Sequence, residues 1–431
     1  MLEWLKITGA GPKTKDRVIE LDFAESMNFI TGDNGLGKTF ILDVAWWALT
    51  RTWPAPDRMT LPQRDLPKGL KPVIEYSFTK ARGTTTWPSD FDWQGQYWKL
   101  PEGRPPNPGM VIYAQVDGGF AVWDPARNHQ FYAKKNKETK TPPAYIFSSK
   151  QVWDGYQHED GTWLCNGLIR DWASWQKENK ESWELLRKVI RALSPSDDEP
   201  MQPGDLTRIS LDDVRDMPTI RMPYGMDIPL AHTSAGMRRI ITLAYLLVWT
   251  WQEHRRACQL IKTDQADQIT FLIDEIEAHL HPKWQRRIML SLSEVMAALT
   301  GRDNSAVQLI VATHAPLVLA SIESYFEAEK DRLFHLGFDG EFATVEQMSW
   351  ALHGDASNWL TSPVFALDEA RSLNAQKAIQ AAQAWMAGRT GDLTAPLNTK
   401  EAIDTALRAA VPSTDDIVFQ WQLANGGGKQ A

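Results

Sequence analysis

The start of the chain alternates apolar and polar residues in a pattern typical of strands. LEWLKIT at 2–8, VIELDF at 18–23 and MNFITG at 27–32 are rich in β-branched and aromatic residues and are separated by turn-forming residues. From Thr39 to about Arg51 the apolar residues recur at helical spacing and share one face. The predicted order here is strand, glycine-rich loop, helix.

From Trp53 to about Pro108 the chain is interrupted by prolines, which leave room only for short strands. Ten prolines fall between residues 53 and 108, which predicts loops around a β-rich lobe. MVIYAQVDGGFAVWD at 110–124 predicts two strands joined by a turn at Gly118 and Gly119. KKNKETK at 134–140 is interpreted as a solvated loop, with nucleic-acid contact as the alternative.

The second half of the chain alternates helical and strand patterns. A helical segment at 163–193 is followed by the linker SPSDDEPMQPGD. The later elements are expected as a helix at 234–262, a strand at 269–275, a helix at 282–299, a strand at 307–313 and a helix after Pro316. This alternation predicts a parallel sheet with crossover helices, hence an α/β fold.

Composition fits a globular protein with more than one lobe. The chain has 431 residues, 43% of them hydrophobic and 23% charged. No apolar run is long enough to span a membrane, and the first residues lack the apolar core of a signal peptide, so a cytoplasmic protein without membrane contact is expected. The net charge of −8 speaks against coating nucleic acid unaided, although a local basic patch stays open.

The cysteines and the tryptophans each allow more than one interpretation. Cys165 and Cys258 form no CxxC pair and are expected to be reduced core residues. Nine of the 20 tryptophans fall between Trp87 and Trp183. Core packing is the favoured interpretation, and base stacking or a partner interface are the alternatives.

The glycine-rich loop carries the clearest chemistry. It matches the P-loop pattern at every fixed position and lies between a predicted strand and helix. Backbone N–H groups of such a loop converge on phosphates, the lysine reaches the β- and γ-phosphates, and the threonine binds Mg²⁺. The expected ATP-binding residues are Gly32, Asp33, Asn34, Gly35, Leu36, Gly37, Lys38 and Thr39.

An apolar strand ending in two acids supplies the expected catalytic carboxylates. In P-loop enzymes a carboxylate at a strand end holds the Mg²⁺ shell, so Asp274 is assigned as a metal ligand together with Thr39. Glu275 is assigned as the base that orients and deprotonates the attacking water.

HTSAGMRR at 232–239 begins a helix 35 residues before these acids. It resembles the ABC signature motif, normally LSGGQ, with Ser234 and Gly236 at the serine and second glycine and Ala235 at the first. The resemblance implies that Ser234, Ala235 and Gly236 contact ATP bound to an opposite subunit, and hence a homodimer or higher oligomer.

ATHAP closes the strand at 307–313 and places His314 where the ABC family keeps its switch histidine. The resemblance implies that His314 senses the γ-phosphate and the attacking water. EAHLHP at 277–282 occupies the family's D-loop position, and no further cluster suggests a metal besides Mg²⁺. The family's Q-loop glutamine stays open between Gln115 and Gln151.

The motif set resembles the RecF, SMC and OLD branch of ABC ATPases. Residues 38–234 leave no room for an SMC coiled coil, and the Glu plus DxD set of an OLD nuclease does not follow His314. The segment from about Asp339 resembles the C-terminal part of stand-alone ATPases of bacterial anti-phage systems such as Septu, which accompany a separate HNH nuclease.

The combined prediction is an ABC-type α/β ATPase that uses ATP and Mg²⁺ and controls a partner nuclease in anti-phage defence. A DNA-repair ATPase of RecF type and an ATP-stabilised scaffold with little turnover are the alternatives. The expected division is an N-terminal part of the nucleotide-binding lobe at 1–160, a helical lobe with the signature at 161–257, the remaining nucleotide-binding lobe at 258–338, and a C-terminal helical region at 339–431.

Overall fold

The computed structural model describes residues 1–79, 85–101, 106–129, 144–300 and 306–426. The chain forms two compact units, Met1–Gly354 and Asp355–Ala431. The basic segment 134–140 lies outside the described residues, so its interpretation as a solvated loop stays a prediction.

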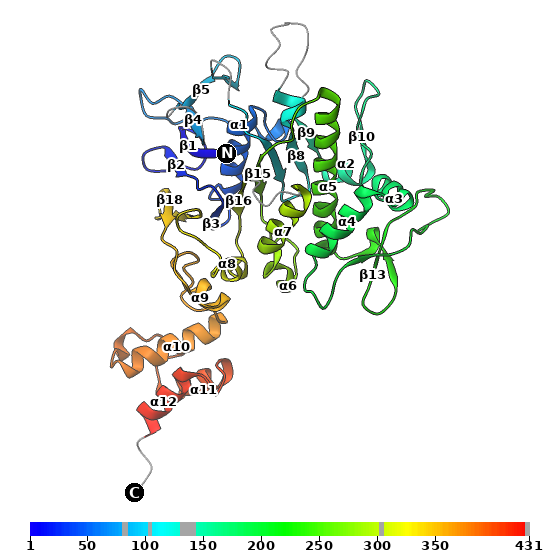
Figure 1. The fold of residues 1–431 in the computed structure, drawn as a ribbon. Coiled ribbons are helices and arrows are strands. Elements are labelled where there is room, and N and C mark those ends of the chain that lie inside the picture. Colours follow the sequence, from blue (N-terminus) through cyan, green and yellow to red (C-terminus); the bar gives the residue numbers. More distant parts are fainter. Residues whose placement is uncertain (80–84, 102–105, 130–143, 301–305, 427–431) are drawn as a thin grey trace. The chain divides into compact units, whose positions relative to one another are not determined.

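An eight-stranded sheet forms the centre of the first unit, in the order β18-β17-β3-β16-β15-β7-β8-β9 (Figure 1). The five strands from β17 to β7 run parallel, and β18, β8 and β9 are antiparallel to their neighbours. Their bounds are β3 Met27–Gly32, β7 Met110–Ala114, β8 Phe120–Trp123, β9 Tyr145–Phe147, β15 Gln268–Ile273, β16 Ala306–Ala312, β17 Arg332–Phe338 and β18 Ala343–Met348. The predicted parallel sheet is confirmed.

A second, antiparallel sheet has the order β2-β1-β4-β5-β6. Its strands are β1 Leu2–Thr8, β2 Val18–Asp22, β4 Val73–Phe78, β5 Trp87–Asp92 and β6 Tyr97–Trp98. Helix α1, Lys38–Thr50, contacts β1 of this sheet and β3, β7, β15 and β16 of the large sheet, and is buried over most of its length. The helix that follows the P-loop is therefore fixed on two sides.

The helical lobe differs in part from the sequence-based expectation. The segment 163–193 is not one helix: it begins with β11, Trp163–Cys165, and continues as α3, Leu168–Glu178, and α4, Glu181–Ala192. Asn179 ends α3 in the left-handed conformation, with φ of 50°, which Asn tolerates better than most residues. Helix α2, Ser149–Asp154, and strand β10, Tyr156–Gln157, precede these elements.

The long signature helix agrees closely with the prediction. Helix α5 spans Ala235–Ile261, between an N-cap at Ser234, whose hydroxyl accepts from the N–H of Met237, and a left-handed C-cap at Lys262. A small sheet leads into it, with strands β12 Gln202–Pro203, β13 Thr219–Arg221 and β14 Asp227–Pro229.

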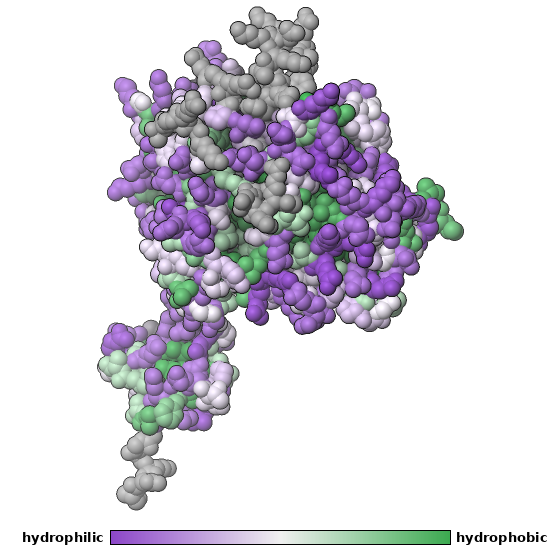
Figure 2. Space-filling model, in the orientation of Figure 1, coloured by the Kyte–Doolittle hydropathy of each residue, from purple (hydrophilic) through white to green (hydrophobic). Residues whose placement is uncertain are grey.

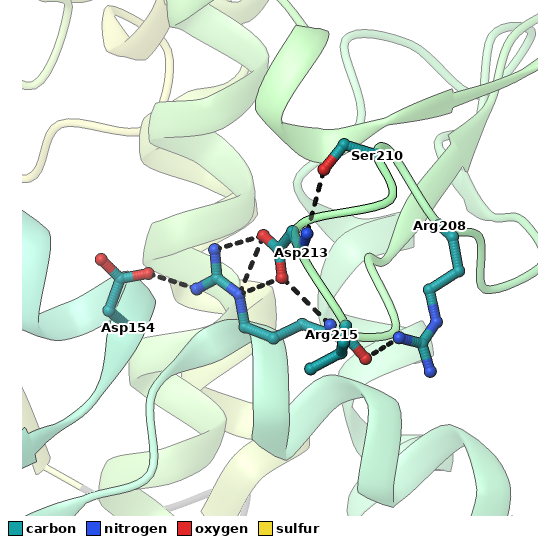
Figure 3. Close-up of polar contacts among 6 residues, drawn as sticks. Asp154, Arg208, Ser210, Asp213 and Arg215 are labelled. Carbon is teal, nitrogen blue, oxygen red and sulfur yellow. Dashed lines mark hydrogen bonds and ion pairs between the residues drawn. The ribbon is translucent and has the colours of Figure 1, made fainter.

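Ion pairs fix the loop between β12 and β13 (Figure 3). Arg215 pairs with Asp154 of α2 at 2.6 Å and with Asp213 at 2.7 Å. The backbone N–H of Asp213 donates to the Ser210 hydroxyl at 3.0 Å, and Arg208 donates to the carbonyl of Val214. The predicted linker is thus followed by a loop of defined shape.

After β15 the chain forms two helices where one was expected. Helix α6, Pro282–Gln285, is followed by α7, Ile288–Thr300, and α8 spans Pro316–Ile322. The segment 339–431 was expected to be helical, but it contains strand β18. This strand pairs with β17 at the edge of the large sheet.

The second unit is helical. Its helices are α9 Ala356–Leu360, α10 Leu373–Met386, α11 Lys400–Ala410 and α12 Asp416–Gly426. Ala378, Ile379, Ile403, Leu407 and Trp421 belong to one apolar core shared by α10, α11 and α12.

Burial supports the core interpretation of both residue types singled out in the sequence. Cys165 and Cys258 are free and buried. Five of the nine tryptophans between 87 and 183 are buried, namely Trp98, Trp123, Trp172, Trp175 and Trp183. On the face of the larger unit drawn in Figure 2, hydrophilic residues cover most of the surface and hydrophobic residues gather near the middle. No helix in the described ranges is both long and apolar enough to span a bilayer.

Candidate functional site

Three neighbouring parallel strands end at the predicted site. β3 leads into the P-loop, β16 leads to His314, and β15 leads to Asp274 and Glu275. Since β16 lies between β3 and β15, their carboxyl ends bring these residues together at one edge of the sheet. The site is therefore a consequence of strand order.

The P-loop spans the turn from β3 into α1. Gly37 is the N-cap of α1 and has a φ of 100°, a conformation that favours glycine. The 13-residue helix that follows points its free N–H groups into the loop, which suits a phosphate.

The Lys38 side chain lies across the loop. Its ammonium donates to the carbonyl oxygens of Gly32 and Asp33, both at 2.8 Å. Burial lowers the pKa of Lys38, while the negative charges of Glu275, Asp274 and Asp33 oppose this effect. The cation is thus held among acids at the point where phosphates are expected.

Thr39 and Asp274 are in direct contact. The Thr39 hydroxyl donates to Asp274 Oδ2 at 2.8 Å, which joins the P-loop helix to the end of β15. The other carboxylate oxygen, Asp274 Oδ1, is buried and has no hydrogen-bond partner among the residues that the structure describes. Burial also raises the pKa of Asp274. A hydroxyl beside a buried carboxylate with an unused oxygen fits the oxygen ligand set of Mg²⁺.

Glu275 and His314 face each other beside this pair. Glu275 Oε1 lies 3.8 Å from His314 Nε2. Burial lowers the pKa of His314, and the positive charge of Lys38 adds to the effect. Neutral imidazole at physiological pH can accept as well as donate a hydrogen bond.

Glu277 holds the histidine loop in place. Its carboxylate accepts from the Thr313 hydroxyl at 2.8 Å and from the backbone N–H of His314 at 2.5 Å. The sequence placed Glu277 only in the D-loop motif and gave it no role. Its position two residues after Glu275 was the available signal.

Arg239 connects the signature helix to the acidic strand end. Its guanidinium donates to the carbonyl oxygens of Asp274 at 3.0 Å, Glu275 at 2.9 Å and Val116 at 2.9 Å. Glu275 has a φ of 47°, a conformation that costs energy in a residue other than glycine. The arginine therefore binds the backbone at a strained point next to the expected base.

Asp43 of α1 forms a cluster with Arg58 and Tyr113. Asp43 accepts hydrogen bonds from Arg58 Nε and from the Tyr113 hydroxyl, both at 3.0 Å. Burial raises the pKa of Asp43 to about 6, although the charge of Arg58 acts against it. The sequence did not single out this cluster, because its members are 15 and 70 residues apart.

The two glutamines left open by the sequence have different environments. Gln115 directly follows β7 and is buried, and the carbonyl of its neighbour Ala114 accepts from the N–H of Asp274 at 3.0 Å. Gln151 instead completes a capping box with Ser148 at the start of α2. The structure thus places Gln115 beside the site.

The signature residues are at the N-terminus of α5. Ser234 and Ala235 are exposed, whereas Gly236 is buried against the D-loop. A Cβ atom at Gly236 would lie 2.5 Å from the carbonyl oxygen of His279, so the close approach requires glycine.

Comparisons with known proteins identify one matching family and one relative with partial similarity. Residues 114–320, just under half of the chain, match the family described as "AAA domain, putative AbiEii toxin, Type IV TA system". A 150-residue stretch is 27% identical to the "Retron Vc95 probable ATPase" of Vibrio cholerae serotype O1 biovar El Tor. It covers 34% of this chain and 26% of that protein, so the similarity extends over about a quarter of that relative's length.

Solved structures with some similarity include SMC heads. The SMC head domain from Thermotoga maritima has a TM-score of 0.40 and 15% identity, covering 81% of this chain and 99% of that one. The Pyrococcus furiosus Smc head, solved with an extended coiled coil and the C-terminal domain of ScpA, has a TM-score of 0.37 and 13% identity, with 81% and 96% covered.

The P-loop, the acidic strand end and the histidine loop on neighbouring strands, with a signature helix beside them, define an ATPase of the ABC type. Within that class, the match over residues 114–320 and the similarity to a retron ATPase support a likeness to the RecF, SMC and OLD type.

Proposed function

We propose that the chain binds ATP with Mg²⁺ and hydrolyses it. The observation that carries the proposal is the 2.8 Å hydrogen bond between Thr39 and Asp274, with Glu275 and His314 beside it. Thr39 and Asp274 would hold the Mg²⁺, which when bound neutralises negative charge on the phosphates.

Each remaining residue has a task that its surroundings support. Lys38 exchanges the carbonyl oxygens of Gly32 and Asp33 for phosphate oxygens, which gives stronger, charge-assisted hydrogen bonds. Glu275 takes a proton from the attacking water, and His314 hydrogen-bonds to the γ-phosphate and to that water.

A second copy completes the site. The N-terminus of α5, where Ser234 and Ala235 are exposed and Gly236 is buried, offers hydrogen-bond donors suited to a γ-phosphate of the opposite subunit. Because each chain gives and receives the same contact, the assembly is a two-fold homodimer with two shared sites. Closure then depends on bound ATP and reopening on hydrolysis.

ATP titration tests the binding step. Lys38→Ala should lose ATP binding, because the variant lacks the cation aimed at the β- and γ-phosphates. Lys6→Ala, an exchange on the other sheet, is the matched control. Binding of ATP to Lys38→Ala with wild-type affinity would refute the P-loop assignment.

In the cell, we propose, the protein is a cytoplasmic component of anti-phage defence that controls a partner nuclease. The similarity to a retron ATPase and the resemblance of the C-terminal segment to Septu ATPases support this role. Within the described ranges no group of three or more His, Cys, Asp or Glu side chains is placed to hold a metal ion, which favours a nuclease on a separate chain.

A phage challenge tests this role. This role predicts a nuclease gene beside the gene for this protein. Cells carrying both genes should survive with the wild-type protein and die with Lys38→Ala or after deletion of that nuclease gene. Equal survival of all three strains would contradict it. Location of the gene in a replication operon would favour the RecF-type alternative, and ATP-dependent assembly with background turnover would favour the scaffold.

A further inference from the structure

A cavity of about 720 Å³ lies between the turn after β7, helix α2 and the first half of α5. Its lining includes Gln115 and Arg239, but not the P-loop, Asp274, Glu275 or His314. The cavity therefore borders the nucleotide site, and Ala235 of the signature segment lies in its lining. Its volume is in the range of small-molecule binding sites.

The walls of this cavity are mostly apolar. They are formed by Phe120, Trp153, Leu243, Leu246, Ile273 and Ile276, among others. The indole N–H of Trp153 donates to the Thr242 hydroxyl at 3.1 Å, which fixes α2 against α5. With its N–H satisfied, the ring offers the cavity an apolar surface that is already in place.

The positively charged side chains that line the cavity outnumber the acidic ones. Lys150 of α2 and Arg238 of α5 are both exposed, and within the part of the chain that the structure describes neither side chain makes an ion pair. The one acid, Asp117, has an oxygen engaged by the N–H of Gly119 at 2.7 Å. Arg239 is held by three carbonyl oxygens. Two cations therefore remain for an anion.

We propose that this cavity binds a small molecule with an apolar, ring-sized body and one anionic group. The body would occupy the apolar walls, and the anion would lie between Lys150 and Arg238. Charge complementarity favours this ligand over a neutral one, because a charged hydrogen bond is roughly twice as strong as a neutral one. The cavity contains none of the P-loop, Asp274, Glu275 or His314, although Ala235 of the signature segment contributes to its lining.

The probe 8-anilinonaphthalene-1-sulfonate has this chemistry and reports binding by fluorescence. The full chain should bind it saturably, at one molecule per chain. Leu243→Trp fills the cavity and should weaken binding at least tenfold. The double variant Lys150→Glu/Arg238→Glu should also weaken it at least tenfold, while uncharged N-phenyl-1-naphthylamine binds this variant and wild type alike.

The control is Lys188→Glu/Arg191→Glu, the same charge reversal on the exposed face of α4, which should leave probe binding unchanged. Melting temperatures verify that each variant is folded. Probe affinity unaffected by both cavity variants would overturn the proposal. So would probe affinity that falls as protein concentration rises, since a second copy would then occupy the cavity.

Discussion

The backbone N–H of His314 donates to the Glu277 carboxylate at 2.5 Å. The same carboxylate accepts from the Thr313 hydroxyl, so one side chain from the turn after β15 fixes the loop after β16. Because Glu275 lies on that same turn, Glu277 sets the distance between the expected base and the switch histidine.

Glu277→Ala should keep ATP binding and slow hydrolysis. Loss of hydrogen bonds to a charged group costs about 1.5–3 kcal/mol, which corresponds to roughly 10- to 150-fold in rate if the cost falls on the transition state. Glu277→Gln keeps one acceptor and should be intermediate. The measurement is phosphate release at saturating ATP, and equal rates for all three proteins would show that the contact has no role in hydrolysis.

Arg239→Ala should reduce turnover more than it reduces ATP affinity. The arginine supports the strained backbone at Glu275 and does not contact the P-loop through any hydrogen bond described. Arg239→Lys should recover part of the rate, because an ammonium can reach fewer of the three carbonyls. Arg256→Ala, an exposed change on the same helix, is the control. A variant with lowered ATP affinity and unchanged turnover would contradict this assignment.

The Asp43 cluster predicts a defined pH dependence of stability. The folded-state pKa of Asp43 is about 6, against an ordinary value of 3.8, so the folded state binds the proton more tightly. The unfolding free energy should therefore fall as pH rises from about 4 to about 6, by roughly 3 kcal/mol for a shift of about two pH units.

Asp43→Asn should lose this slope, as measured by urea unfolding between pH 4.5 and 7. Asp57→Asn, an exposed carboxylate in the same region, should follow the wild-type slope. Parallel curves for wild type and Asp43→Asn would show that Asp43 does not titrate in this range.

Ser234→Arg should leave ATP binding by each chain nearly intact and abolish turnover, since it places bulk and charge where the opposite nucleotide docks. Mixing it in equal amounts with Lys38→Ala should restore about a quarter of wild-type activity, because half of the dimers are mixed and each has one intact site. Full activity of Ser234→Arg alone would exclude the shared site.

Short-range patterns predicted the elements that carry the site. The strand before the P-loop, the helix after it and α5 from its N-cap at Ser234 to its end near Lys262 agree with the sequence, because caps, glycines and apolar periodicity are local signals. The prediction of a helical segment at 163–193 missed the break at Asn179. This break depends on a left-handed backbone conformation that composition does not reveal.

Contacts between distant residues could not be predicted. Glu277 with Thr313, Arg239 with Glu275 and Asp43 with Tyr113 are joined only by strand order and helix packing. The sequence analysis found site residues through motifs. The partners named here lie at sequence separations that no motif specifies. Tertiary structure alone brings them to the site.

Glu275→Gln tests the central claim most directly, because it changes the expected base and little else. The variant should bind ATP as tightly as wild type and release phosphate about 10²- to 10⁴-fold more slowly, since an amide cannot accept the proton from water. Its ATP-bound form should accumulate as a dimer in size-exclusion chromatography. Phosphate release by Glu275→Gln at the wild-type rate would contradict the account.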